Sequence, residues 1–161
     1  MIIYVAPISI VHCENDHVIK RFRTPEDCAL EARWYRRVPH LCPELIAVDG
    51  TDLVTKRYPV AWETPEWRDV DALLRLLRAV EAEGLHHRDA HLRNIVLRDG
   101  EPLLIDWYTA MECPQARSYD LFGEASLLPK PERHLDFQSW DTPNPYSIKE
   151  AWGVPLSAVV A

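Results

Sequence analysis

Short stretches of alternating apolar and polar residues dominate the start of the chain. Residues 2–22 are rich in β-branched side chains and are interrupted by Pro7, which predicts two or three strands, the last being residues 17–22. Residues 44–58 contain two further apolar stretches around Asp49-Gly50, a turn dipeptide that favours a hairpin. The first third of the chain is therefore expected to be mainly sheet.

Two segments have helical patterns instead. Residues 24–38 begin with Thr24 as an N-cap, followed by a proline and two acidic residues at the positive end of the helix dipole, and Pro39 ends this helix. The clearest helix begins at about Asp69 and stops at Gly84. We expect its buried stripe to consist of Val70, Leu73, Leu74, Leu77 and Val80.

A second hairpin is predicted over residues 94–106, "NIVLRDGEPLLID", with its turn at Asp99-Gly100. Farther along, residues 119–128 and the short segment 147–152 have helical patterns. The second half of the chain is thus expected to be mainly helical around one small hairpin.

The proline-containing segment 59–67 is the best candidate for a boundary inside the chain. It separates a strand-rich part, residues 1–58, from a mainly helical part, residues 59–161. This order predicts an α+β fold with two lobes in one domain, and it places the polar residues of interest where the lobes would meet.

Composition and charge narrow the function classes. The 161 residues are 47% hydrophobic and 27% charged, as in globular proteins. No run reaches the roughly 18 apolar residues that a membrane span needs, and the N-terminal residues lack the basic region of a secretory signal. The net charge of −7 argues against general nucleic-acid binding.

The four cysteines form no C-x-x-C pair. Because no export signal is expected, we interpret them as free thiols in a reducing, cytoplasmic compartment. A zinc site built from these cysteines and the seven histidines would lack the usual ligand spacing. The cysteines are Cys13, Cys28, Cys42 and Cys113.

Three polar residues flank the second hairpin. Asp89 and Asn94 lie between the long helix and the hairpin, and Asp106 ends the second strand. Because a hairpin brings its ends together, Asn94 and Asp106 become neighbours, and their oxygen atoms suit a hard cation such as Mg²⁺. Asp89 could then orient or deprotonate a hydroxyl acceptor. Capping of helices and turns would explain any one of these residues, but not their joint spacing.

This segment resembles the catalytic core of protein kinases. The pattern H-R-D-x-x-x-x-N is matched by His87, Arg88, Asp89 and Asn94, and "IDW" stands in place of Asp-Phe-Gly, with Asp106 in the metal position. The resemblance implies that Asp89 is the catalytic aspartate and that His87 braces the loop. It also implies that Asn94 and Asp106 hold Mg²⁺ or Mn²⁺, with ATP as co-substrate.

The resemblance extends in both directions. "VIKRF" looks like the third-strand lysine motif, which implies that Lys20 grips the α- and β-phosphates of ATP. Glu31 is its implied ion-pair partner; Glu26 is the rival, but capping and dipole effects already explain it. "SYDLFG" resembles the start of the helix whose aspartate, here Asp120, supports the catalytic loop, although a simple helix cap is nearly as good an explanation.

The chain also departs from the kinase pattern. No G-x-G-x-x-G is present, and Pro7 and Ser9 stand in the first hairpin region, where glycines would let backbone amides approach phosphate. Trp107 and Tyr108 replace the Phe-Gly after the metal aspartate, which brings the usual switching of that segment into question.

The interval between Asp106 and Asp120 holds only thirteen residues, and no A-P-E motif follows. These features imply a very short activation segment and a minimal C-terminal lobe, so Arg88 must have another partner than a phosphate on that segment. The short interval resembles that of the KEOPS-type, RIO and lipopolysaccharide-core kinases. The "IDW" motif is also similar to the corresponding motif of aminoglycoside and choline phosphotransferases. We expect the acceptor site to be shallow or completed by a protein partner.

Three functions fit these observations. The first is a small Mg²⁺-ATP phosphotransferase acting on a hydroxyl of a protein or small molecule, the second a pseudokinase that binds nucleotide or a partner, and the third an ATPase or nucleotidyltransferase. Tryptophans in proline-flanked segments either form a binding interface or pack over a small core. Arginines near the catalytic-looking loop either bind phosphate or are simply exposed to solvent. These residues are Trp62, Trp67, Trp140, Trp152, Arg88, Arg93 and Arg98.

Overall fold

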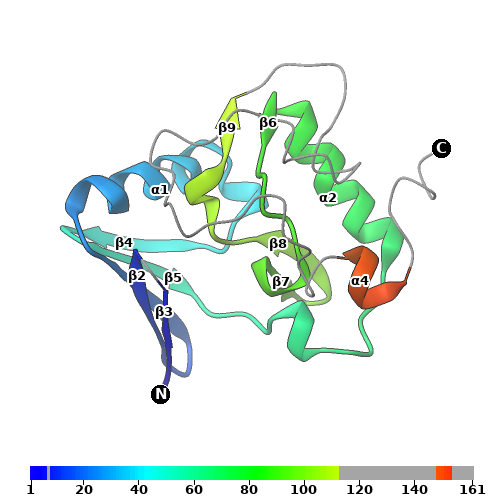
Figure 1. The fold of residues 1–161 in the computed structure, drawn as a ribbon, viewed down its shortest axis with the longest axis horizontal. Helices are drawn as coiled ribbons and strands as arrows, with labels where there is room; N and C mark the ends of the chain where they lie inside the picture. The colour runs from blue at the N-terminus through cyan, green and yellow to red at the C-terminus, as the bar shows by residue number, and fades with distance from the viewer. Residues whose placement is uncertain (7, 113–147, 154–161) are drawn as a thin grey trace.

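The computed structural model describes residues 1–6, 8–112 and 148–153 (Figure 1). Its strands are β1 (Ile2–Val5), β2 (Ser9–Cys13), β3 (His17–Phe22), β4 (Leu45–Asp49), β5 (Asp52–Lys56), β6 (Leu85–His86), β7 (Ile95–Arg98), β8 (Glu101–Leu104) and β9 (Met111–Glu112). Its α-helices are α1 (Pro25–Arg37), α2 (Val70–Ala82) and α4 (Ile148–Trp152). Short 3₁₀ turns are η1 (Pro39–Leu41), η2 (Ala61–Glu63), η3 (Leu92–Asn94) and η4 (Trp107–Thr109).

The first five strands form one antiparallel sheet in the order β1-β2-β3-β5-β4. Helix α1 contacts β3, β4 and β5, and Figure 1 shows it lying along the sheet. In the register between β2 and β3, Val11 lies opposite Lys20 and Ser9 opposite Phe22. Because residues two apart share a face of a strand, these four side chains lie on one face of the sheet.

Helix α1 begins and ends where the sequence predicts. The Thr24 side chain accepts a hydrogen bond from the Asp27 N–H, which satisfies one of the free donors of the first turn. At the other end the Val38 N–H donates to the Trp34 carbonyl, and Pro39 starts a separate 3₁₀ turn. One face of the helix is buried and carries Cys28, Glu31, Ala32, Trp34 and Tyr35.

Helix α2 is capped by Asp69, whose carboxylate accepts from the Ala72 N–H. Gly84, at φ 70°, follows the helix in the left-handed conformation that glycine adopts most readily. The predicted buried stripe is partly wrong. Three of its residues, Leu73, Leu77 and Val80, are buried as predicted, but Ala72 and Leu76, which were not predicted, are buried too. Val70 and Leu74 are only half-buried, because the core lies slightly to one side of the predicted stripe.

The second hairpin is present and turns through two residues with positive φ, Asp99 at 51° and Gly100 at 85°. Asparagine, aspartate and glycine are the residues that tolerate this conformation. The Ile105 N–H donates to the Asn94 carbonyl over 2.9 Å, so the hairpin brings Asn94 to the residue just before Asp106 at the backbone. The Leu97 N–H donates to the Pro59 carbonyl, so segment 59–67 is tied to β7.

These elements make an α+β fold, with antiparallel sheets and packed helices. The helical prediction for residues 119–128, and with it Asp120, lies outside the described residues, as do Cys113 and Trp140. The short helix α4 agrees with the prediction over 147–152. Cys13, Cys28 and Cys42 carry free thiols. Within the described ranges, no helix has the length and apolarity needed to cross a membrane.

Two leucine substitutions on α2 test which face of the helix supports the core. Leu77 is fully buried and Leu74 is not, so we expect Leu77→Ala to lower the free energy of unfolding by about 2–5 kcal/mol and Leu74→Ala by less than half as much. Urea denaturation of the two variants measures the difference. Equal losses would contradict the helix orientation, since both variants remove the same atoms.

Candidate active site

Lys20 stands at the centre of a charged cluster built from three elements. Its ammonium group on β3 donates to Glu31 Oε2 of α1 over 2.8 Å and to Asp106 Oδ1, which follows β8, over 2.9 Å. Glu31 has no exposed side-chain surface, whereas Asp106 is 43% exposed. One positive charge thus serves two carboxylates, and one of these carboxylates also faces solvent.

Burial and charge act in opposite directions on these groups. Burial favours the neutral form of Lys20, but the nearby carboxylates of Asp106 and Glu31 outweigh it and raise the lysine pKa. Burial raises the pKa of Glu31, and the shared lysine offsets this only in part. At Asp106 burial also acts to raise the pKa, but the Lys20 charge prevails and lowers it. Lys20 is therefore charged and Asp106 ionised at neutral pH.

His87 is buried in the loop before the second hairpin and makes contacts through both ring nitrogens. Nε2 lies 2.9 Å from the Ile105 carbonyl, so this nitrogen carries the proton and donates it. Nδ1 accepts from the Asp89 N–H over 3.3 Å. The ring meets Trp107 edge to face at 4.8 Å. His87 therefore joins the backbone of Asp89 to the end of β8.

Asn94 and Asp89 contact each other directly. The Asn94 side-chain N–H₂ donates to both the backbone oxygen and the Oδ2 of Asp89, each over 3.0 Å. Since that end of the amide points to Asp89, the amide oxygen is the atom left to face a cation. The Asp89 side chain is 37% exposed, and this leaves its carboxylate accessible to an acceptor.

His91 is a site residue that the sequence analysis did not single out. Its Nε2 lies 3.4 Å from Asp89 Oδ1 and 3.2 Å from Asn94 Nδ2, and its Nδ1 accepts from the Arg93 N–H. The His91 ring therefore contacts both Asp89 and Asn94. The sequence could have indicated His91 through its position two residues after Asp89, because a histidine so close to the aspartate can itself hold a proton or orient the carboxylate.

Trp107 and Tyr108, the residues in place of Phe-Gly, connect the segment after Asp106 to α1. The Trp107 N–H donates to Glu31 Oε1 over 3.3 Å, and its fully buried indole donates to the Leu104 carbonyl. The Tyr108 hydroxyl donates to Asp27 over 3.4 Å. These bonds attach η4 to the helix at two levels, so the segment after Asp106 is packed inward.

The turn between β1 and β2 occupies the place of the missing glycine-rich loop. Ala6 and Ser9 exchange two backbone hydrogen bonds across it. The Ser9 hydroxyl is buried and has no hydrogen-bond partner in the described part of the chain. By the β2–β3 register it lies on the same sheet face as Lys20, so this face offers a hydroxyl group and an ammonium group together.

The residues around the hairpin fit a magnesium ion. Asp106 has a partly exposed carboxylate, one oxygen of which accepts from Lys20, and left-handed backbone at φ 62°, and Asn94 adds a carboxamide oxygen. Within the described ranges, no three His, Cys, Asp or Glu side chains gather as a closed metal site. Magnesium needs only one or two protein ligands when phosphates and water complete its shell, so an oxygen pair suits it.

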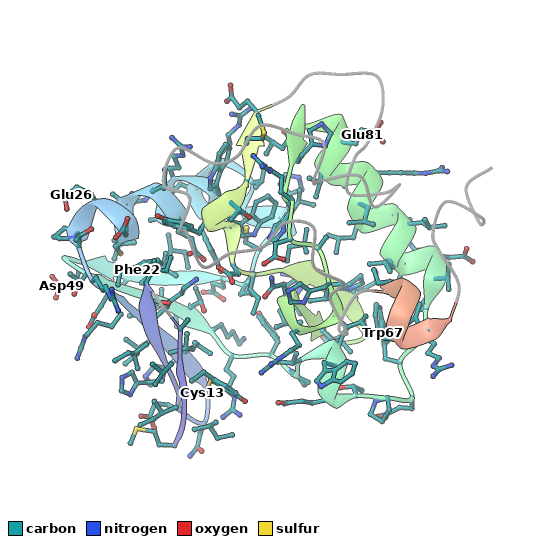
Figure 2. The ribbon with its side chains drawn as sticks, viewed as in Figure 1. Cys13, Phe22, Glu26, Asp49, Trp67 and Glu81 are labelled. Carbon is teal, nitrogen blue, oxygen red and sulfur yellow. The ribbon has the colours of Figure 1, made fainter. Side chains whose placement is uncertain are left out.

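The remaining predicted residues lie as follows. Arg88 is buried at φ 73°, and its guanidinium contacts the Met111 sulfur over 3.2 Å. Glu26, the rival to Glu31, is exposed in the first turn of α1. Lys20 bonds Glu31 and not the rival. Arg93 and Arg98 are exposed. Figure 2 shows Glu26 at the outer end of α1.

Comparison of the sequence with models of known protein families gives a match. The model of a phosphotransferase enzyme family, APH, matches residues 47–146. The chain belongs to the APH phosphotransferase family. The match includes Asp89, Asn94 and Asp106, while Lys20 and Glu31 precede it. No match to a curated protein was found. Membership in this family, which lies within the protein-kinase-like superfamily, indicates a phosphotransfer reaction.

Removing the Lys20 charge should expose the cost of burying Glu31. Lys20→Met takes away the main counter-charge of Glu31, and we expect a loss of about 3–5 kcal/mol in the free energy of unfolding at about pH 8. Burial then raises the Glu31 pKa further, so the folded state binds a proton that the unfolded state releases. Stability should therefore rise as the pH falls towards about 5, near the ordinary glutamate range.

Urea denaturation of Lys20→Met at several pH values measures this effect. Lys56→Met, on the neighbouring strand β5 and exposed, is the matched control and should lose little at any pH. A Lys20→Met variant whose deficit is the same at about pH 5 and about pH 8 would contradict the buried-carboxylate interpretation.

Proposed function

We propose that this APH family member is a Mg²⁺-ATP phosphotransferase that moves the γ-phosphoryl group to a hydroxyl acceptor. The observation that carries the proposal is the cluster of Lys20, Glu31 and Asp106 beside the Asp89–Asn94 pair. An ammonium, a carboxamide and two accessible carboxylates are the groups that phosphoryl transfer needs for charge neutralisation and positioning.

In this proposal Lys20 contacts the α- and β-phosphates, and Glu31 holds the lysine in place. Asp106 and Asn94 would hold Mg²⁺, and the Lys20 ammonium, which donates to Asp106 in the structure, would contact phosphate instead. When bound, Mg²⁺ supplies neutralisation of the phosphate charge.

The transfer step needs few groups. Asp89 accepts the proton of the acceptor hydroxyl, the acceptor oxygen forms a bond to the γ-phosphorus, and the bond from that phosphorus to the ADP oxygen breaks. His87 fixes the Asp89 backbone, and His91 and Asn94 orient its carboxylate. The products are a phosphorylated acceptor and ADP. Within a two-lobe arrangement, residues 1–58 would supply Lys20 and residues 59–161 the catalytic loop.

Asp89→Asn tests the proposed base without changing the residues proposed to bind nucleotide. The amide keeps the size of the side chain and can still accept from Asn94, so we expect transfer of labelled γ-phosphate from ATP to fall by about 10²-fold or more, with nucleotide affinity little changed. Transfer is followed with the protein alone and with a cell lysate as a source of acceptors. Asp71→Asn, exposed on α2, is the matched control and should retain full activity.

Each outcome of this assay has a meaning. Label that moves to the protein or to a lysate component, and depends on Asp89, supports the proposal. Label released only as free phosphate would replace it with ATP hydrolysis. Nucleotide binding without any transfer would leave a binding module, the pseudokinase alternative.

Asp106→Asn tests the metal ligand. We expect ATP binding measured by calorimetry with Mg²⁺ to drop to the level seen with a chelator, because the amide oxygen is a far weaker ligand than a carboxylate. Lys20 keeps Glu31 as a partner in this variant, so thermal unfolding should remain cooperative. Unchanged Mg²⁺-dependent binding would contradict the role of Asp106.

A further inference from the structure

A cavity lies at the far end of the second hairpin from the candidate active site. It has a volume of about 540 Å³, within the range of pockets that hold small ligands. Its lining comes from segment 58–67 and from the hairpin turn, namely Tyr58, Pro59, Thr64, Glu66, Trp67, Leu97, Asp99 and Gly100. Leu97, the lining residue of β7 nearest to Asn94, is three residue steps from it, or about 10 Å of strand, and Asp99 is five steps away, or about 16 Å.

The chemistry of the lining is that of a site for an organic cation. Tyr58, Pro59, Trp67 and Leu97 give apolar and aromatic surface, while Glu66 and Asp99 place two carboxylates at the exposed rim. None of the described residues that line the cavity is a lysine, arginine or histidine. Aromatic faces and carboxylates both attract ammonium groups.

Two contacts hold this end of the hairpin in shape. The Trp67 indole N–H donates to the Gly100 carbonyl over 3.0 Å, and its ring lies 5.8 Å from that of Trp152 on α4. The Lys56 ammonium lies 5.9 Å from the centre of the Tyr58 ring, so this ring already contacts a cation of the chain itself, and Trp67 is the aromatic residue on which the argument for a ligand rests. Figure 2 shows Trp67 beside α4, well away from Glu26 and Asp49.

We propose that this cavity binds an organic ammonium ion: a small molecule with an apolar, flat body and a primary or quaternary amine. The apolar body packs against Trp67 and Leu97, and the amine lies at the rim between Glu66 and Asp99. The site is separate from the residues assigned to phosphoryl transfer. Its ligand is therefore not the group that receives phosphate at Asp89, and the inference stands whether or not the chain transfers phosphate.

A pair of matched probes tests the proposal in the full chain. 2-Phenylethylammonium and 2-phenylethanol have the same ring and chain length but differ in charge. The readout is the NMR signal of the Trp67 indole N–H, identified by its absence in Trp67→Phe. We expect saturable shifts with the ammonium and about tenfold weaker binding of the alcohol, because an exposed cation–π contact and two rim carboxylates each contribute a few-fold.

The double variant Glu66→Gln/Asp99→Asn should lower the ammonium affinity several-fold, and leave only the few-fold preference over the alcohol that the cation–π contact supplies. Asparagine tolerates the positive φ of position 99, and both side chains are exposed, so the fold is retained. The matched control is Glu26→Gln/Asp49→Asn, which removes one helix carboxylate and the aspartate of the other Asp-Gly turn. This control should bind the ammonium as the unchanged protein does.

Three results would overturn the proposal. They are equal affinity for the ammonium and the alcohol, an ammonium affinity that is unchanged in Glu66→Gln/Asp99→Asn, and a Trp67 signal that does not move in a saturable way. The second result would indicate binding at another acidic place, such as the carboxylates around Lys20. Circular dichroism of the variants confirms that each is folded before affinities are compared.

Discussion

The sharing of one lysine by two carboxylates is the interaction on which the rest of the site depends. Lys20, Glu31 and Asp106 come from a sheet strand, a helix and the end of a hairpin, and their contacts are 2.8 and 2.9 Å. A fully buried carboxylate is costly without a counter-charge, so Glu31 fixes the helix to the strand that carries Lys20. One ammonium serves both carboxylates, and the half-exposed Asp106, whose pKa the lysine charge lowers, is the one that a cation could reach.

The bonds around this cluster make the site pre-formed. Glu31 accepts a second hydrogen bond from the Trp107 backbone, and Tyr108 reaches Asp27 one turn earlier on the same helix. His87 then carries the constraint from the end of β8 to Asp89. Catalytic groups held on strands and helices by such bonds keep their geometry better than groups on free loops. The aromatic residues in place of Phe-Gly thus support the site by attaching it to α1.

Much of this arrangement could be predicted from the sequence because the signals are local. The Thr24 cap, the Asp99-Gly100 turn and the apolar runs around it each determine the backbone within a few residues. The hairpin alone was enough to predict that positions 94 and 106 meet. The contact between Lys20 and Glu31 could be anticipated only through the kinase resemblance, since eleven residues and a change of element separate them.

What escaped prediction depends on tertiary partners. The buried face of α2 is shifted because the position of the core, and not the helix period, decides between Leu74 and Leu76. The bond from Tyr108 to Asp27 spans 81 residues, and no periodicity or spacing signals a contact between residues so far apart. His91 was overlooked for a different reason: its neighbours in the motif already explained the loop, although its ring is the one that contacts both Asp89 and Asn94.

The second hairpin relates the two charged regions of the molecule. At one end Asp106 finds Lys20, so its carboxylate is partly compensated before any ligand arrives. At the other end Asp99 and Glu66 face an apolar cavity with no basic residue among its described lining. Carboxylates left uncompensated beside aromatic surface favour a cation from outside the chain. Acidic residues thus lie at both ends of the same β-strand pair, and of Asp106, Asp99 and Glu66 only Asp106 forms one of the described ion pairs with a lysine.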